Sequence, residues 1–563
     1  MLNKEISGLV KKSIIDEVRG FVPTDKIPHY IISMIYIHKL SSESTNLDKD
    51  EERIYNFANN LIKIGSKESQ KRLINFIDNC SEEELKSYVE YLLLDYKDWK
   101  WNIFSNNELL EIVYELLMLK DSGDMIYDMG SGFGSFLAFC LKKARELQIA
   151  YMGLYGIEIS SELAFVSEMA FRIINDSYNN ARVINANALE DNNLPATAGY
   201  VFPPFGYKVF DYDKVPSKIF EDIVLSNKNS NEWIFVDKLL NKLNGGKAVA
   251  IVRGSALFSE ADRKYRNRLI EKGYIEGIIE LPVNSIDDLA MKIFIVKFSS
   301  NNKAVKFVDA SEMTTNNPKA KKPILDYKAI IDAYNNKPSY RDLEELKDTL
   351  NLTPSNVLLD VTKPSNGVLL KELAEVFTGN QYTLGVFEKN GMLTSKNTGY
   401  RILTSGDIED GVVNWAKLQR IEYNDTKFDK YAVKKNDIIV TSKSSKVKTV
   451  VVDIEPKDKI IVTGGMIIVR PDVTKLNPTY FKMFIDSQNG QNVLKSIQKG
   501  AYIVTINASA LENIFVPIIP IEKQINKSNK YNEKLTTLLA LKQEIEKVGE
   551  SIKNIYFDES EDD

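Results

Sequence analysis

Residues 125–143 read MIYDMGSGFGSFLAFCLKK, and this stretch decides the fold of the region around it. Its short apolar run predicts a strand, Gly130, Gly132 and Gly134 predict a turn, and the residues that follow predict an amphipathic helix. A strand that enters a helix through such a turn is typical of α/β proteins that bind nucleotides or nucleosides, because glycines let backbone N–H groups approach a ligand. The alternative is a glycine turn that only permits close packing of the helix.

The next apolar run, LYGIEI at residues 154–159, narrows this prediction. It carries Glu158 near its end, where a carboxylate can accept hydrogen bonds from both hydroxyls of a ribose. A phosphate-binding loop would need Gly-Lys-Ser/Thr after the turn, and the sequence has none there. We therefore expect an adenosyl group rather than ATP. After the third strand, Asn187 is placed to hydrogen-bond an adenine edge.

Outward from this unit, the chain divides into regions of different pattern. Residues 1–110 have apolar positions at helical spacing and predict an all-helical N-terminal domain. In residues 111–312 short apolar runs alternate with helical segments, which predicts an α/β domain of Rossmann-like type with a mostly parallel sheet. Residues 313–365 begin polar and Pro-bearing and continue as a helical pattern, so we expect a linker and a helical connection.

The C-terminal regions follow other patterns. Residues 366–520 are rich in β-type runs separated by Gly, Asn and Asp, which predicts a separate α+β domain. Residues 521–563 predict a long helix of the coiled-coil type and a short acidic tail, because apolar residues recur at heptad spacing. These heptad residues are Leu538, Leu541, Ile545, Val548 and Ile552. Such a stripe implies a partner, either a second helix or the chain's own α/β region.

Composition excludes several classes of protein. The 563 residues contain 2 His and 2 Cys, too few for a disulfide framework, a structural zinc site or a histidine-based triad, so we expect no metal site. No segment approaches the roughly 20 apolar residues that span a bilayer, and we expect a cytoplasmic protein without membrane contact. The net charge of −5 argues against a wholly basic DNA-coating protein. The net charge does not exclude a local basic groove, because nucleic-acid binding depends on where the charge lies.

The run YVFPPFG at residues 200–206, at the end of the expected fourth strand, carries a family resemblance. The chain resembles the N6-adenine DNA methyltransferases, and among them the modification subunit of type I restriction-modification systems. Those enzymes carry a motif of the form Asn-Pro-Pro-Phe or Asp-Pro-Pro-Tyr at the end of the fourth strand. NIFSNNELLEIVYELL at 102–117, DMGSGFGSFL at 128–137 and GGKAVAIVRGSALF at 245–258 are similar to further landmarks of that subunit. The order of the motifs is similar to the gamma arrangement of these enzymes.

The resemblance implies a reaction and its residues. S-adenosyl-L-methionine would donate a methyl group to N6 of an adenine that is flipped out of double-stranded DNA and stacks on Phe205. The catalytic motif falls on Phe202, Pro203, Pro204 and Phe205. The positions that match the family's cofactor site are Ser105, Asp128, Gly130, Gly132, Gly134, Glu158 and Asn187.

Two departures from the family pattern bear on activity. Phe202 stands where the family has Asn or Asp, and it cannot accept the hydrogens of the adenine amine. Three readings follow: another acceptor such as Asn185 or Asn187, a catalytically inactive subunit that still holds cofactor or DNA, or a pocket adapted to another task. In the cofactor loop, Phe133 and Ser135 replace small residues, so we expect a narrowed pocket.

Residues 366–520 resemble one target-recognition domain of a type I specificity subunit. Between Lys427 and Lys448 there are seven lysines against two aspartates, a local balance of +5. Within the resemblance this patch predicts phosphate contacts, and we assign DNA binding to Lys443, Lys446 and Lys448; the alternative is a solvated face.

The C-terminal helix is similar to the spacer helix that follows each recognition domain in specificity subunits. Pairing two copies of the chain through this helix would restore two half-sites, and separate methyltransferase, specificity or nuclease subunits are further candidate partners. The leading hypothesis is a site-specific, adenine-directed DNA methyltransferase of a restriction-modification or related defence system, fused to its own recognition domain. The rival is a catalytically inactive DNA-recognition subunit that works with a partner, and Phe202 separates the two.

Overall fold

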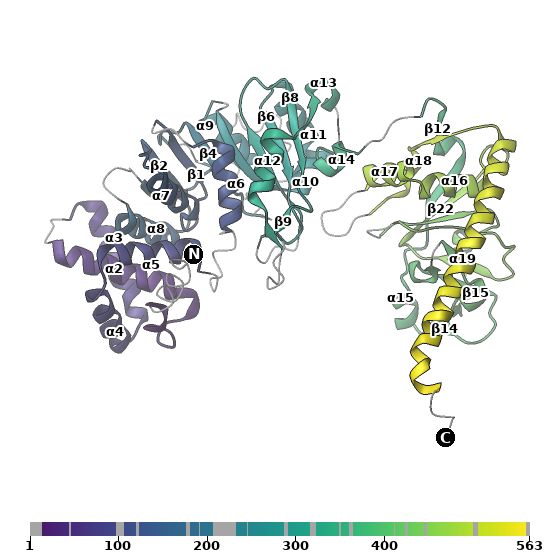
Figure 1. Ribbon diagram of the computed structural model, residues 1–563, viewed down its shortest axis with the longest axis horizontal. Helices are drawn as coiled ribbons and strands as arrows, with labels where there is room; N and C mark the ends of the chain where they lie inside the picture. The colour runs from purple at the N-terminus through teal and green to yellow at the C-terminus, as the bar shows by residue number, and fades with distance from the viewer. Residues whose placement is uncertain are drawn as a thin grey trace. The chain divides into compact units, whose positions relative to one another are not determined.

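The computed structural model forms two compact units, Met1–Leu358 and Leu359–Asp563 (Figure 1). It describes residues 14–43, 47–96, 106–119, 123–175, 181–190, 192–205, 232–244, 246–286, 291–315, 323–347, 349, 351–359, 364–409, 411–422, 426–443, 447–498 and 505–558. In these ranges no helix is both long and apolar enough to cross a membrane.

The first unit begins with helices that pack on the glycine-turn region. These are α2 (Ile27–Glu43), α3 (Lys49–Leu61), α4 (Lys67–Asp78), α5 (Glu82–Leu94) and α6 (Asn107–Leu117). Side chains cap their first turns and satisfy N–H groups that lack an intrahelical partner: Asp48 forms a capping box with Glu51, and Ser81 with Glu84. Helices α2, α3 and α5 lie against α8 (Ser161–Ile174), so the N-terminal region and the α/β region share one core (Figure 1).

Within the described residues, nine strands of the first unit form one sheet in the order β11-β8-β6-β7-β5-β4-β1-β2-β3. The strands are β1 (Met125–Met129), β2 (Gly153–Glu158), β3 (Ala181–Asn185), β4 (Ala198–Val201), β5 (Lys247–Arg253), β6 (Ile275–Glu280), β7 (Ile293–Phe298), β8 (Ala304–Asp309) and β11 (Ser339–Asp342). Five neighbouring pairs are parallel, and the pairs that β7 and β11 make are antiparallel. The predicted mixed α/β fold with a large, mostly parallel sheet is confirmed.

Helices cover both faces of this sheet, as its doubly buried strands require. They are α7 (Ser135–Leu147), α8, α9 (Glu232–Lys242), α10 (Gly254–Phe258), α11 (Arg263–Glu271), α12 (Tyr327–Asn336), α13 (Leu343–Leu346) and α14 (Pro354–Val357); β9 (Thr314–Thr315) and β10 (Ile324–Leu325) pair separately.

Strand order locates the place where a ligand can enter. The chain runs from β1 to β2 and β3 on one side and returns to β4 on the other side of β1. Open α/β sheets bind ligands beyond the carboxyl ends of the strands at such a reversal, because the connections there leave in opposite directions.

Among its described residues, the second unit contains two four-stranded sheets. One has the order β13-β22-β19-β20 and the other β14-β18-β15-β21. Their strands are β13 (Ala374–Thr378), β14 (Leu393–Thr394), β15 (Tyr400–Leu403), β18 (Arg420–Ile421), β19 (Ile438–Thr441), β20 (Thr449–Val451), β21 (Lys459–Val462) and β22 (Met466–Pro471). Short pairs and helices complete the unit: β12 (Gly367–Leu369), β16 (Ile408–Glu409), β17 (Val412–Val413), β23 (Phe515–Pro517), α15 (Leu384–Lys389), α16 (Pro478–Asp486), α17 (Gln488–Ile497) and α18 (Ala508–Glu512).

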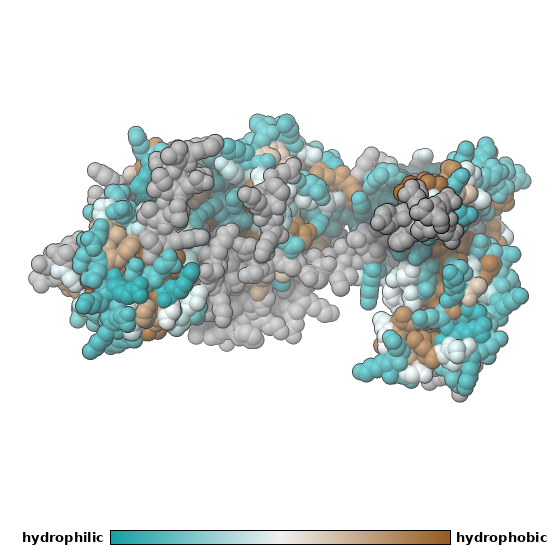
Figure 2. All heavy atoms as spheres, turned by 60° about the horizontal axis from the view of Figure 1, so that its bottom comes forward, coloured by the Kyte–Doolittle hydropathy of each residue, from teal (hydrophilic) through white to brown (hydrophobic). Residues whose placement is uncertain are grey.

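The long helix α19 (Ile521–Asp558) is held at its start and exposed along its second half. Gln524 accepts a hydrogen bond from the backbone N–H of Asn477, and Tyr531 donates one to Asp486. The five heptad residues predicted from the sequence are 49–71% exposed. Figure 2 shows that hydrophobic residues also reach the surface of this unit between larger hydrophilic areas. Pairing of α19 with another helix stays a prediction.

Candidate functional site

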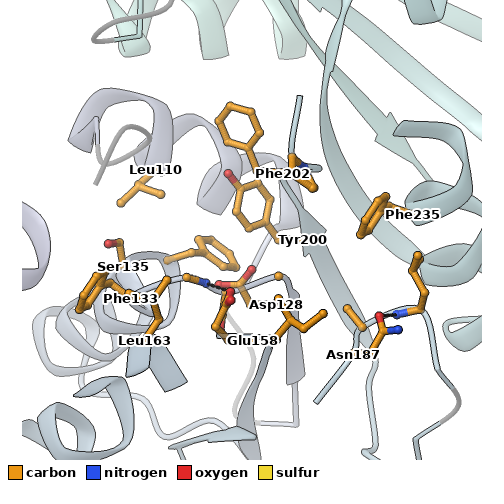
Figure 3. A pocket seen from close by; sticks show the side chains of 18 residues that line it. Leu110, Asp128, Phe133, Ser135, Glu158, Leu163, Asn187, Tyr200, Phe202 and Phe235 are labelled. Carbon is orange, nitrogen blue, oxygen red and sulfur yellow. Dashed lines mark hydrogen bonds between the residues drawn. The ribbon is translucent and has the colours of Figure 1, made fainter. Parts of the chain in front are cut away.

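A cavity of about 330 Å³ opens where the carboxyl ends of β1, β2 and β4 meet (Figure 3). The glycine turn and Glu158 line one end, and Phe202 and Pro204 line the other. A volume of a few hundred Å³ suits a nucleoside-sized ligand. Of the residues predicted from the sequence, the cavity brings together Asp128, Gly130, Gly132, Glu158, Asn187, Phe202 and Pro204.

The glycine turn has the left-handed backbone that its residues permit. The φ angles of Gly130, Gly132 and Gly134 are 81°, 56° and 70°. A Cβ on Gly134 would lie 2.6 Å from the Phe171 ring, so this position also needs close packing. At Gly130 and Gly132 no described atom lies within 4 Å of such a Cβ, because both face the cavity. Gly134 is therefore needed for close packing, and Gly130 and Gly132 line the cavity.

Glu158 is bound to the glycine turn by its own carboxylate. One oxygen accepts the N–H of Gly132 at 2.9 Å and the other accepts the N–H of Ser160 at 2.8 Å. These bonds fix the carboxylate at the cavity wall. Each carboxylate oxygen has a further lone pair, so Glu158 can still accept hydrogen bonds from ligand hydroxyls.

Asp128 lies deeper in the same wall and is only 2% exposed. Burial, and next the negative charge of Glu158, raise the pKa of this carboxyl well above its ordinary value. A cationic ligand group would relieve this destabilisation, because an opposite charge favours the ionised form. Asp128 is therefore suited to a ligand that carries an ammonium group.

Ser131 adds an unsatisfied polar atom to the cavity. Its buried Oγ has no hydrogen-bond partner among the residues that the structure describes. The side chain lies against Gly156 of β2, where an added Cβ would come within 2.7 Å of Oγ. Buried hydroxyls are normally hydrogen-bonded, so this atom is available to a ligand or water in the cavity. Size, two carboxylates and this hydroxyl together fit an adenosyl group with an amino-acid tail.

Tyr200 and Phe202 line the opposite wall of the cavity, and Phe205 packs on Phe202 without lining the cavity itself. Tyr200 packs on Phe136 with ring centroids 4.6 Å apart, and Phe202 meets Phe205 edge to face at 5.2 Å. The guanidinium of Arg253 lies 5.4 Å from the Phe205 ring centroid. Arg253 is itself fixed by Glu232, with Nε 2.5 Å from Oε1. This wall can accept a flat, apolar ring.

The remaining predicted residues lie at the edge of the site or outside the described ranges. Pro203, Phe205 and Gly134 are next to lining residues without lining the cavity themselves. Ser105 falls outside the described residues. Asn187 lines the cavity, but its Oδ1 accepts the N–H of Leu189 at 3.0 Å.

Asn185, one of the two alternative acceptors considered from the sequence, does not line this cavity. Its amide donates to the carbonyl oxygens of Glu158 and Ile159, both at 3.0 Å. Asn185 therefore has a structural role at the end of β3.

Phe133 and Ser135 of the cofactor loop line the cavity and contact the N-terminal helices. The Phe133 ring meets the His29 ring edge to face at 5.1 Å, and Ser135 donates to the carbonyl oxygen of Leu93 at 2.9 Å. Burial lowers the pKa of His29 to about 4, so this ring is neutral at neutral pH. The N-terminal helices thus support the loop directly.

Sequence reasoning assigned no role to several residues that line the cavity. They are apolar or aromatic residues, half of them on helices, and such positions cannot be told from ordinary core residues without the tertiary contacts. They are Leu110, Phe136, Ile159, Leu163, Ala188, Leu189, Tyr200 and Phe235. Tyr200 alone among them had a local signal, because it lies two positions before Phe202 on the same face of a strand.

In the second unit the predicted DNA-binding lysines differ from one another. Lys443 is exposed. Lys448 donates from Nζ to the carbonyl oxygens of Ile408 at 2.8 Å and Ser405 at 3.4 Å, which ties it to a neighbouring turn. Lys446 lies outside the described residues.

The two aspartates counted against the lysine patch are each paired. Asp437 binds Arg470, with Oδ2 2.8 Å from Nη2, and Asp429 binds Lys459 at 2.6 Å. Because both acids are neutralised by cations outside the patch, they reduce its positive charge less than the sequence count implies. This favours an anionic partner at the patch.

Several aromatic side chains and one arginine in this unit are held by contacts within the fold. Tyr400 donates to Asp429 at 3.0 Å, and Trp415 donates to Asp453 at 3.2 Å. Arg401 binds Asp458 at 2.6 Å. Tyr382 is half-exposed and packs edge to face on Phe387.

Comparisons with known proteins agree with the resemblance. The chain is 23% identical over 316 residues to the methylase subunit of the type I restriction enzyme MpnII of Mycoplasma pneumoniae. That alignment covers 52% of this chain and 58% of the relative, so the chain spans little more than half the length of this relative.

Two solved structures were also found to be similar. A type I restriction-modification methyltransferase subunit from Streptococcus thermophilus is 17% identical with a TM-score of 0.46, covering 60% of this chain and 81% of that one. The type IIG restriction endonuclease BpuSI is 11% identical with a TM-score of 0.46, covering 92% of this chain and 74% of that one.

A family model, that of the N-6 DNA methylases, matches residues 82–366. This range includes α6, the glycine turn, Glu158, the Pro203-Pro204 motif and the whole nine-stranded sheet. It amounts to just over half of the 563 residues. The chain therefore belongs to the N-6 DNA methylase family.

Proposed function

We propose that the chain is a DNA methyltransferase that transfers a methyl group from S-adenosyl-L-methionine to N6 of adenine in double-stranded DNA. One observation carries the proposal: a single cavity joins the glycine turn, Asp128 and Glu158 to Phe202 and Pro204. A cofactor at one end and a flipped base at the other would then meet inside the protein. Family membership supports the reaction class.

The residues of the cavity would divide the work of binding. Glu158 accepts the ribose hydroxyls, Asp128 binds the ammonium group of the amino-acid tail, and Ser131 supplies a further hydroxyl. S-adenosylmethionine, when bound, supplies a methyl group on a positively charged sulfur. The buried carboxylates and aromatic rings of the cavity exclude water from that group and favour its charge.

The target base would stack on Phe205 beside Pro203 and Pro204. The guanidinium of Arg253 lies 5.4 Å from the centroid of the Phe205 ring, so it helps to hold that ring in place. A backbone carbonyl can accept one hydrogen of the adenine amine. Phe202 offers no second acceptor, and a loss of one preorganised polar group costs on the order of 10² to 10³ in rate. We therefore expect slow transfer.

The second unit would supply DNA recognition. We propose that residues 366–520 form a target-recognition domain fused to the methyltransferase region of residues 111–312, with residues 1–110 as a helical domain and 313–365 as the connection. Exposed Lys443 and its lysine neighbours would contact phosphates, since both nearby aspartates are already paired. The exposed stripe of α19, in residues 521–563, would pair with a second copy or with a separate subunit of a restriction-modification system.

A second candidate function follows from Phe202. Its ring packs on Phe205 and is only 9% exposed, so the target end of the cavity is apolar. A subunit of this kind would bind cofactor and DNA and recognise a site for a partner without transferring a methyl group.

Long-read sequencing that detects N6-methyladenine separates the two candidates. The chain is expressed in a host without DNA methylation, beside an Asp128→Asn variant as the matched control. Methyladenine at one recurrent motif with the wild type, and none with the variant, is the expected result. Folded wild-type protein that leaves the host DNA unmethylated would refute the enzyme and favour the inactive subunit.

A further inference from the structure

Tyr200 lies between the two ends of the cavity, and the family motif gives it no role. It pairs with Asp128 in the parallel register of β1 and β4, so both side chains lie on one face of the sheet. Phe202, two positions further, lies on the same face. The Tyr200 ring is fixed by Phe136, 4.6 Å away, and the residue is only 5% exposed.

The hydroxyl of Tyr200 makes no hydrogen bond with any residue that the structure describes. In Figure 3 it points toward the side of the cavity where Phe202 lies and away from Asp128. The hydroxyl is not among the buried atoms that lack a partner, so it is accessible from the cavity that Tyr200 lines. A tyrosine hydroxyl with an apolar ring packed in the core and an accessible oxygen is suited to bind a ligand that enters the cavity.

Other polar side chains that line the cavity already form hydrogen bonds within the protein or lie at the glycine-turn end of the cavity. Both oxygens of Glu158 accept backbone N–H groups, Oδ1 of Asn187 accepts the N–H of Leu189, and Ser135 donates to Leu93. Ser131 lies against β2, at the glycine-turn end. Of the described lining residues, Tyr200 alone brings a side-chain hydroxyl toward Phe202.

We propose that the Tyr200 hydroxyl accepts a hydrogen bond from the exocyclic amine of the target base, and so replaces in part the acceptor that position 202 lacks. This inference rests on the function proposed above. Accepting an amine hydrogen draws the nitrogen lone pair out of conjugation with the ring, which makes the nitrogen a better nucleophile. The proton that the amine loses on methylation passes to water. A phenol oxygen is a weaker acceptor than an amide or carboxylate oxygen, so the replacement is partial.

The protonation state of Tyr200 suits this role. Burial, and next the Asp128 carboxylate, raise the pKa of Tyr200 well above its ordinary value. The group therefore stays a neutral hydroxyl at neutral pH and adds no second negative charge beside Asp128.

The test is Tyr200→Phe, which removes one oxygen and keeps the ring on Phe136. Tyr127→Phe is the matched control, because Tyr127 precedes Asp128 on β1, has its hydroxyl bonded to Asn192 at 3.2 Å and does not line the cavity. Methyl transfer to duplex DNA is measured with radiolabelled S-adenosylmethionine. S-adenosylhomocysteine binding is measured by calorimetry. We expect Tyr200→Phe to lower kcat/KM about tenfold, the value of one neutral hydrogen bond. Its affinity for S-adenosylhomocysteine should change less than about twofold. Tyr127→Phe should equal the wild type in both measurements.

A second readout does not depend on catalysis. With the cofactor site saturated by S-adenosylhomocysteine, adenosine should bind more tightly than purine riboside, which lacks the amine, and Tyr200→Phe should abolish that preference. Equal kcat/KM for wild type and Tyr200→Phe would overturn the inference while the proposed function stands. If the wild type transfers no methyl group, the proposed function fails, and the nucleoside preference alone decides: its loss in the variant supports the contact, and its absence in the wild type overturns it.

Discussion

Replacing Phe202 with Asn should raise the rate of adenine methylation, because it returns an acceptor to the target end of the cavity. Phe202 lines that end beside Pro204 and packs on Phe205 at 5.2 Å. A preorganised polar group at an active site is worth on the order of 10² to 10³ in rate. If Tyr200 already supplies about tenfold of this, the expected gain in kcat for Phe202→Asn is about 10- to 100-fold.

The same substitution should cost stability. Phe202 is only 9% exposed, and removing a buried Phe side chain costs about 3 to 5 kcal/mol. Because the ring borders a cavity rather than a fully packed core, we expect the lower figure, about 3 kcal/mol. In a unit that spans Met1–Leu358, with an unfolding entropy of about 2.1 cal/mol/K per residue, that lowers the melting temperature by roughly 4 °C.

Steady-state methyl transfer to DNA, with a melting curve on the same sample, tests both figures. Phe202→Leu is the matched control, since it shortens the ring and enlarges the pocket without adding an acceptor. If Phe202→Leu gains as much as Phe202→Asn, or if a folded Phe202→Asn gains nothing, the argument from the missing acceptor is wrong.

Four further predictions follow from the described contacts. Gly134→Ala should abolish S-adenosylhomocysteine binding in calorimetry and lower the melting temperature, because φ is 70° and its Cβ would lie 2.6 Å from Phe171; unchanged binding would contradict the geometry. Asp128→Asn should raise the free energy of unfolding by an amount that grows as pH rises above 3.8, because a raised pKa means that stability is lost on ionisation; urea unfolding at pH 5 and pH 8 measures it, and an equal change at both would refute the assignment. Lys443→Ala should reduce the salt slope of DNA binding by about 0.9, whereas Lys448→Ala should chiefly lower the melting temperature, since its Nζ donates to Ile408 and Ser405. Ile545→Asp, at a position 71% exposed on α19, should convert a dimer to a monomer in sedimentation velocity; a wild type that is monomeric at every concentration would rule out pairing between copies.

The helical pattern of residues 1–110 illustrates what local periodicity conveys and what it omits. Capping residues such as Asp48 and Ser81 are local features, and each precedes the first turn of a helix in the structure. The tertiary role of these helices is not local. His29 and Leu93 contact the cofactor loop through Phe133 and Ser135, and no spacing in the sequence relates positions so far apart.

The lysine patch shows the same limit for charge. Counting residues gave +5 between Lys427 and Lys448. The structure pairs both aspartates of that window with cations outside it and gives Lys448 a structural contact. Charge balance in a fold depends on partners that the chain brings from a distance, so a window count is only a first estimate.

The sequence by itself determined the α/β class, the glycine turn, and the placement of Asp128 and Glu158 at strand ends. Each follows from strand periodicity or turn chemistry, which neighbouring residues suffice to define. That Phe202 replaces an acceptor is what the resemblance to the methyltransferase motif implies. Only the tertiary structure decided that these groups share one cavity, that Asn185 lies outside it and that the Tyr200 hydroxyl points into it. The physical reason is register: β1 and β4 are far apart in sequence, and their parallel pairing, Asp128 beside Tyr200, sets which side chains meet.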